Sequence, residues 1–150
     1  LDEANEQFHR ALLYAIAGNG VIALVLALCH RPLLSMLTQD SQILRLAAPL
    51  FALGVLVEMG RAVNIITGGA LRSTGDAGYA ALISTTLMWC VGVPSAYLFG
   101  GYFGLGLTGV WVSMALDECL RGAMSYRRWR TGRWRKTSAL APVARVELAS

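Results

Sequence analysis

Two long stretches of the chain contain only uncharged, mostly apolar residues. No Asp, Glu, Lys, Arg or His occurs from Ala11 to Cys29 (19 residues) or from Ala77 to Leu116 (40 residues). A helix of about 20 residues crosses the roughly 30 Å of hydrocarbon in a bilayer. The first stretch therefore predicts one membrane-spanning helix, whereas the second is twice the necessary length and has to fold back on itself.

The reversal within the long stretch is predicted at a group of glycines. These are Gly100, Gly101, Gly104 and Gly106. Pro94 predicts a kink in the helix that precedes them. The long stretch therefore contains two spans, at about 78–99 and 105–126.

A further apolar segment lies between the two uncharged stretches. The first span is expected to end at His30, Arg31 and Pro32, and the polar connection 33–45 is expected to lie at the membrane interface. Asp40 or Ser41 is the expected N-cap of the next helix, which occupies about 46–71. With the first span at about 11–29, the chain is predicted to be an all-α polytopic membrane bundle of four transmembrane helices over residues 1–136. A disordered cytoplasmic tail is expected over 137–150.

The composition argues against a soluble enzyme. Hydrophobic residues make up 55% of the 150 residues, charged residues only 15%, and the mean hydropathy is +0.52. The three cysteines fall in or at the ends of apolar runs and lack the spacing of metal ligands. No phosphate-binding glycine loop and no Ser/His/Asp set occurs. We therefore expect no catalytic residues, no metal site and no cofactor.

The distribution of the basic residues predicts the orientation in the membrane. The chain has 13 Lys and Arg against 9 Asp and Glu, and seven of the 13 follow Tyr126. If both ends are cytoplasmic, these seven lie inside with Arg10 and Arg72, against only Arg31 and Arg45 outside, as the positive-inside rule favours. Because the chain starts with Leu1 and not with Met, and acidic residues precede the first span, we expect a piece of a longer polypeptide.

Charged residues near the middle of the second span are the most unusual feature of the sequence. Glu58 and Arg61 lie three positions apart, with Asn64 one step further along the same helical face. Charges at membrane mid-depth are costly, by about 2.5 to 3.5 kcal/mol on insertion scales, so both should face protein or water. Two interpretations stay open, a cation or proton site and a permanent ion pair that locks helices together.

A second group of charges lies toward the end of the fourth span. Asp117 and Arg121 have the i, i+4 spacing of a favourable ion pair, and Glu118 lies beside them. We interpret this group as a structural and interfacial ion network at the cytoplasmic end.

The run that follows the fourth span alternates cations with indoles. Its members are Arg127, Arg128, Trp129, Arg130, Arg133, Trp134, Arg135 and Lys136. Such a run can stack on single-stranded nucleic acid. Directly after a membrane span, it is more typical of a membrane-surface anchor that binds anionic lipid. We favour the lipid anchor and expect no nucleic acid partner.

Several linked motifs resemble MATE (multidrug and toxic compound extrusion) transporters. The sequences EMGRAVN (58–64) and GALRSTGD (69–76) resemble their tenth helix and the following loop. WCVGVP (89–94) resembles the eleventh helix, and FGLGLTGVW (103–111) the entry to the twelfth. LTQD (37–40) resembles the connection between the ninth and tenth helices. The resemblance covers about residues 3–136.

This resemblance implies a function and a set of partners. It implies that the chain forms helices nine to twelve of a twelve-helix transporter and lies in the second of its two lobes. Such a transporter exports amphipathic or cationic drugs in exchange for Na⁺ or H⁺. The missing first lobe of the same chain and membrane lipid would be its partners, and the bacterial inner membrane its location. Some members carry a cation-binding acid on the tenth helix, which makes Glu58 a candidate for that role, with Arg61 and Asn64 as polar partners.

Two rival interpretations remain. A lipid-linked saccharide flippase of the same superfamily would keep the fold but prefer a cavity with many cations, whereas only Arg61 lies at mid-depth here. A free-standing four-helix scaffold or regulatory subunit would belong to another functional class.

Overall fold

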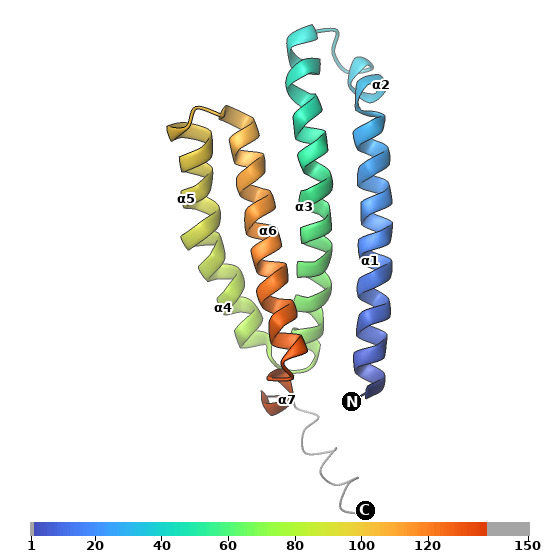
Figure 1. Cartoon of the computed structure of the whole chain (residues 1–150), viewed down its shortest axis with the longest axis vertical. Helices are drawn as coiled ribbons and strands as arrows, with labels where there is room; N and C mark the ends of the chain where they lie inside the picture. The colour runs from blue at the N-terminus through green and yellow to red at the C-terminus, as the bar shows by residue number, and fades with distance from the viewer. Residues whose placement is uncertain (1, 138–150) are drawn as a thin grey trace, which may run out of the picture.

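A computed structural model describes residues 2–137 of the chain. All regular elements in this part are helices (Figure 1). They are α1 (Asp2–Leu28), α2 (His30–Ser35), α3 (Ser41–Ser73), α4 (Ala77–Leu87), η1 (Met88–Gly92), α5 (Val93–Ala96), η2 (Tyr97–Tyr102), α6 (Gly106–Arg130) and α7 (Trp134–Thr137). The predicted all-α membrane bundle is confirmed. The predicted tail over 137–150 lies, beyond Thr137, outside the described residues.

Three helices are long and apolar enough to cross a membrane. They span Glu3–Leu28, Ser41–Ser73 and Ala77–Tyr102, the last combining α4, η1, α5 and η2. The fourth long helix, α6, has 25 residues and is therefore about 37 Å long. It is not among these apolar helices in the described chain. Asp117, Glu118 and Arg121 lie near its middle, so apolarity alone identifies three of the four predicted spans.

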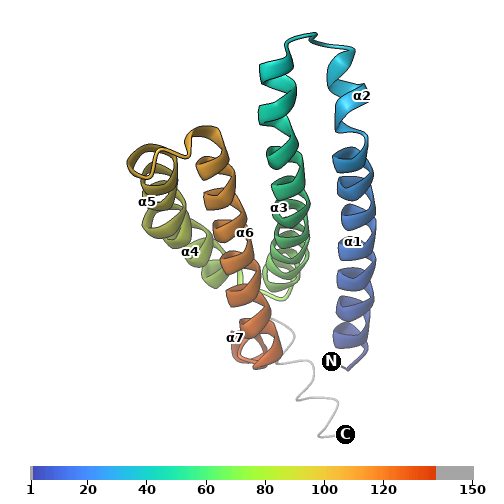
Figure 2. The same ribbon diagram turned by 45° about the horizontal axis from the view of Figure 1, so that its top comes forward.

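Helix α3 is the centre of the bundle. It packs most extensively against α6 and next against α1, and both views show it between these two helices (Figure 2). The α4–η2 helix packs on the other side of α6. The chain therefore passes along the bundle four times in alternating directions, through α1, α3, α4–η2 and α6. The N-terminus and α7 lie at the same end (Figure 1).

The connection between α1 and α3 differs in detail from the prediction. Cys29 separates α1 from α2, and Pro32 lies inside the first turn of α2, where its missing N–H interrupts no hydrogen bond. The Asp40 side chain accepts a hydrogen bond of 2.8 Å from the backbone N–H of Gln42. Asp40 is thus the N-cap of α3.

Only part of the predicted glycine reversal forms the turn. Gly104 and Gly106 have φ of +68° and +56°, a backbone region that favours glycine. Gly100 and Gly101 lie within η2 instead. A Cβ at Gly100 would lie 3.1 Å from Val110 Cγ2, which shows that this glycine allows η2 and α6 to approach closely.

The helix around Pro94 contains two π-helical segments that the sequence did not reveal. These segments, η1 and η2, flank the short helix that starts at Val93 and contains Pro94. Proline removes one helical hydrogen bond, and a π-helical turn is one way to accommodate the loss. The ribbon changes direction between α4 and α5, as the predicted kink requires (Figure 1). The Gly92 carbonyl accepts hydrogen bonds from Ser95 Oγ at 3.3 Å and Ser113 Oγ at 2.8 Å.

Candidate functional site

The charged pair on α3 forms as its spacing predicts. Arg61 Nη1 lies 2.6 Å from Glu58 Oε1, and the two side chains are 36% and 38% exposed within this chain. Residues three apart on a helix are neighbours on its surface, so local geometry is sufficient for this contact.

The same arginine also reaches across to α6. Arg61 Nε lies 3.7 Å from Glu118 Oε1, and Asn64 Nδ2 donates a hydrogen bond of 2.9 Å to Glu118 Oε2. Glu118 is 16% exposed and belongs to this polar network with Glu58, Arg61 and Asn64. Position along the sequence alone groups Glu118 with Asp117 and Arg121. The structure joins parts of the two predicted groups into one network between α3 and α6.

Two glycines allow the helices to approach closely enough for this network. A Cβ at Gly60 would lie 2.9 Å from Cys119 Sγ and 3.0 Å from the Cys119 backbone nitrogen. A Cβ at Gly122 would lie 3.2 Å from the Gly60 carbonyl oxygen. Small residues at a helix crossing favour close packing in membranes. The short side chain of Asn64 can reach Glu118 because of this close crossing.

Asp117 and Arg121 lie on a different face of α6. They form an ion pair within the helix, as the i, i+4 spacing predicts. Asp117 is 6% exposed and packs against η1, where a Cβ at Gly92 would lie 3.3 Å from Asp117 Cγ. Among the described residues, Asp117 Oδ1 and Arg121 Nε have no hydrogen-bond partner. This pair therefore faces the π-helical region and is separate from the network on α3.

The Glu58 and Arg61 pair borders a largely apolar cavity of about 530 Å³. Helices α1, α3 and α6 all contribute to its wall. The other lining residues are Ala23, Leu26, Ala47, Leu50, Phe51, Gly54, Val57, Trp111 and Met114. A mostly apolar cavity with a few charged groups at one side is the usual form of a small-molecule site.

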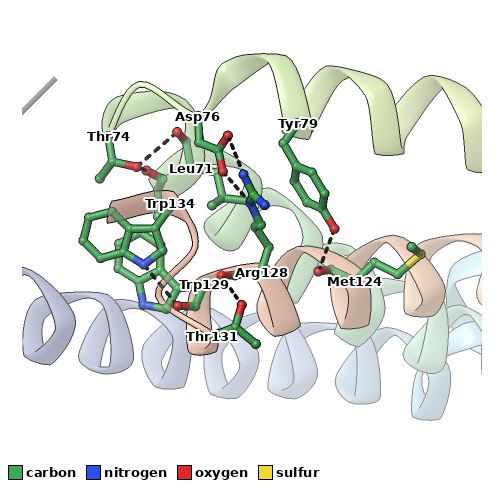
Figure 3. Close-up of polar contacts among 10 residues, drawn as sticks. Leu71, Thr74, Asp76, Tyr79, Met124, Arg128, Trp129, Thr131 and Trp134 are labelled. Carbon is green, nitrogen blue, oxygen red and sulfur yellow. Dashed lines mark hydrogen bonds and ion pairs between the residues drawn. The ribbon is translucent and has the colours of Figure 1, made fainter. Parts of the chain in front are cut away.

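The indoles that follow the fourth predicted span are buried in the bundle. Trp129 and Trp134 are 4% and 1% exposed, and their rings stack with centroids 4.4 Å apart. Trp129 also stacks on Phe8 of α1 and donates a hydrogen bond of 3.1 Å to Asn5 Oδ1. Trp134 donates a hydrogen bond of 3.0 Å to the carbonyl of Trp129 (Figure 3). The structure thus places these two residues in the packed core rather than at a lipid surface.

Gly132 explains why Trp134 turns inward. Its φ of +65° reverses the chain after α6, so that α7 folds back against the helix end. The prediction of a membrane-surface anchor did not take this turn into account.

The arginines of the same run divide into two groups. Arg128 is bound by Asp76 through two contacts, of 2.7 Å from Nε and 3.3 Å from Nη2 (Figure 3). The hydrogen bond to Asp76 raises the pKa of Arg128 above its ordinary value. The exposed arginines are Arg127, Arg130, Arg133 and Arg135. For these four and for Lys136, the lipid anchor stays a prediction.

No group of three or more His, Cys, Asp or Glu side chains in the described part of the chain is arranged to hold a metal ion. The network that contains Glu58 and Glu118 has two carboxylates, one guanidinium and one amide. Its chemistry is therefore that of charge pairing and hydrogen bonding.

Comparison with known proteins identifies the family. A family model described as MatE matches residues 1–98. The chain belongs to the MatE family. With its three apolar helices of membrane length, this MatE chain is a membrane protein.

The relatives carry names that refer to a transporter, to multidrug resistance or to drug extrusion. The chain is 35% identical over 133 residues to "Uncharacterized transporter YisQ" of Bacillus subtilis, covering 89% of this chain and 29% of that protein. It is 29% identical over 120 residues to "Probable multidrug resistance protein NorM" of Thermotoga maritima, covering 79% of this chain and 26% of that one. It is 24% identical over 94 residues to rabbit (Oryctolagus cuniculus) "Multidrug and toxin extrusion protein 2", covering 63% of this chain and 16% of that one.

The MatE chain spans less than a third of the length of these relatives. No solved structure matches it significantly.

Proposed function

We propose that this chain forms helices nine to twelve, in the second lobe, of a twelve-helix efflux antiporter that exports amphipathic or cationic compounds in exchange for Na⁺ or H⁺. Family membership and the relatives' names support efflux. The observation that carries the proposal is the pair Glu58 and Arg61 at the edge of the apolar cavity between α1, α3 and α6. The first lobe of the same polypeptide and membrane lipid are its partners, and the coupling ion takes the place of any cofactor.

The charge of the network suits a coupling site. Glu58 and Glu118 share one guanidinium, that of Arg61, so the three groups together carry one negative charge. A proton or Na⁺ at Glu58 neutralises that charge and frees Arg61 to bind Glu118 alone. Asn64 holds Glu118 in place during this exchange through its hydrogen bond. A charge that is neutralised in one state and present in another favours different conformations in the two states, which is the requirement for alternating access.

The test of ion coupling is Glu58→Gln in the full-length polypeptide. The amide keeps the size of the side chain but carries no charge, so we expect gradient-driven efflux in vesicles to fall to background. Glu3→Gln, which changes an exposed glutamate near the start of α1, is the matched control and should transport normally. If Glu58→Gln reaches the membrane at normal levels and still couples efflux to a gradient, the pair is a structural lock and the coupling role is wrong.

The proposed location is the bacterial inner membrane, with both ends of this segment in the cytoplasm. Gln39 in the α2–α3 connection and Ser73 at the end of α3 are both exposed and lie at opposite ends of the bundle. In a full-length protein without other reactive cysteines, Gln39→Cys should react with an impermeant thiol reagent added outside intact cells. Ser73→Cys should react only after the cells are opened. The reverse labelling pattern would invert the proposed orientation.

The intact mass of the native polypeptide separates the transporter from a free-standing four-helix subunit. Because this chain covers 29% of one relative and 26% of another, a transporter should have about three times the 16.1 kDa of these residues. A native mass near 16.1 kDa would contradict the antiporter proposal.

A further inference from the structure

A small basic cavity lies at the end of the bundle where α4 begins and α6 ends. Its volume is about 250 Å³, less than half that of the cavity beside Glu58. It is lined by Tyr79, Met124, Arg127, Arg128, Thr131 and Arg133. Three arginines therefore line one small space.

Two of the three arginines are available to a ligand. Asp76 compensates the charge of Arg128 and fixes its position. Arg127 and Arg133 are exposed, and neither forms an ion pair with an acidic residue in the described part of the chain. The cavity thus carries two uncompensated positive charges beside a third guanidinium held in place. Arginine presents a planar set of N–H donors that matches the oxygens of a phosphate group.

Contacts between α4 and α6 hold part of the cavity wall in place. The Arg128 guanidinium carbon lies 4.5 Å from the centre of the Tyr79 ring, in a cation–π contact. The Tyr79 hydroxyl points to the Met124 carbonyl, and the Thr131 hydroxyl donates to the Arg128 carbonyl (Figure 3). Tyr79 from α4 and Arg128 from α6 are therefore positioned against each other at one side of the space, which lowers the entropy cost of ordering these two side chains on binding.

The cavity is at the level where lipid headgroups lie. Tyr79 is in the first turn of a membrane-length helix, and Arg127 and Arg128 directly follow the predicted end of the fourth span. Leu82, one turn after Tyr79 on α4, is 63% exposed and continues the same helical face toward the membrane interior. A molecule bound at the arginines would have a polar part in the cavity and room for an apolar part along α4.

We propose that this cavity binds the phosphate group of an anionic phospholipid. Basic pockets between membrane helices bind such headgroups because a cation near the surface attracts anionic lipid. Nucleic acid is less suited, because the indoles that would stack on bases, Trp129 and Trp134, are buried in the core. The site goes beyond a general attraction of the basic run to the membrane, since it includes Tyr79 from a different helix.

The experiment is a titration of the full-length protein with phosphatidylglycerol in micelles of neutral detergent, with bound lipid counted by native mass spectrometry. Arg127→Ala/Arg133→Ala should weaken phosphatidylglycerol binding about 30-fold, as expected for the loss of two surface cations. The matched control is Arg31→Ala/Arg45→Ala, which removes two exposed arginines at the opposite end of the bundle. It changes the net charge equally and should leave this binding within about threefold of normal.

Three results would overturn the proposal. Equal weakening in both double variants would show attraction by net charge alone. Full displacement of phosphatidylglycerol by millimolar inorganic phosphate would identify soluble phosphate as the ligand. Displacement by a single-stranded oligonucleotide whose binding requires Arg127 and Arg133 would identify nucleic acid. A thermal melt of each variant accompanies the titration. If Arg127→Ala/Arg133→Ala melts early, Arg127→Gln/Arg133→Gln takes its place, because it removes the same two charges but keeps more of each side chain.

Discussion

Asn64 on α3 and Glu118 on α6, 54 positions apart in the chain, are joined by a hydrogen bond of 2.9 Å between Nδ2 and Oε2. Through this contact and the Arg61 pair, the charges in the middle of α6 are partly satisfied by α3. A helix that is too polar to stand alone in lipid can thus belong to a membrane bundle.

The Asn64 and Glu118 contact predicts a measurable coupling energy. We expect a double-mutant cycle of Asn64→Ala and Glu118→Ala to give a coupling of about 0.6 to 1.7 kcal/mol in the free energy of unfolding, the range for hydrogen bonds between membrane helices. The measurement is reversible unfolding of the full-length protein in mixed micelles. A parallel cycle of Asn64→Ala with Glu3→Ala, which share no contact, should give zero. Zero coupling for the first cycle would mean that the hydrogen bond has no net effect on stability.

The close crossing of α3 and α6 predicts a strong effect of a single methyl group. Gly60→Ala places a Cβ 2.9 Å from Cys119 Sγ and 3.0 Å from its backbone nitrogen, so the helices have to separate. We expect a loss of about 1 to 3 kcal/mol in unfolding free energy. Gly69→Ala on the same helix is the control, because no heavy atom lies within 4 Å of the new Cβ. Similar melting of the two variants would contradict the crossing described here.

The contact between η2 and α6 predicts a second intolerant glycine. A Cβ at Gly109 would lie 2.5 Å from the carbonyl carbon and oxygen of Phe99, and backbone atoms cannot move aside as a side chain does. Gly109→Ala should therefore lower the melting temperature more than Gly60→Ala. Gly101→Ala, with no neighbour within 4 Å of its Cβ, should melt near the unmodified protein. Equal melting of the Gly109 and Gly101 variants would refute this packing.

The buried indole just after α6 predicts a structural role for Trp134. Trp134→Ala removes a side chain that is 1% exposed and leaves a cavity beside Trp129, so we expect a loss of about 3 to 5 kcal/mol. Trp89→Ala removes an indole that is 62% exposed within this chain and should cost much less. Fluorescence of a variant in which Trp134 is the only tryptophan gives a second readout, because a quencher in water should not reach this side chain, which is 1% exposed. Ready quenching of that residue would place it at the surface.

The predictable part of the fold rests on local patterns. The uncharged stretches locate the helices, because a run of about 20 apolar residues has few alternatives in a bilayer. The ion pairs Glu58 with Arg61 and Asp117 with Arg121 follow from helical spacing alone. The π-helical segments around Pro94 were not predicted. A proline in the sequence indicates that one helical hydrogen bond is lost, but it does not indicate which donors the neighbouring carbonyls then bind. Ser113, on another helix, is part of the answer.

The sequence by itself determined an all-α membrane bundle, the approximate course of its helices and the resemblance to the MATE family, because apolar runs, helical spacing and linked motifs are all readable along the chain. Only the tertiary structure decided that Glu118 joins Arg61 and Asn64, since that contact depends on how closely α3 and α6 cross at Gly60 and Gly122. It also decided that Trp129 and Trp134 are buried. Tryptophan is common both at lipid surfaces and in packed cores, and for Trp134 the turn at Gly132 selects the core.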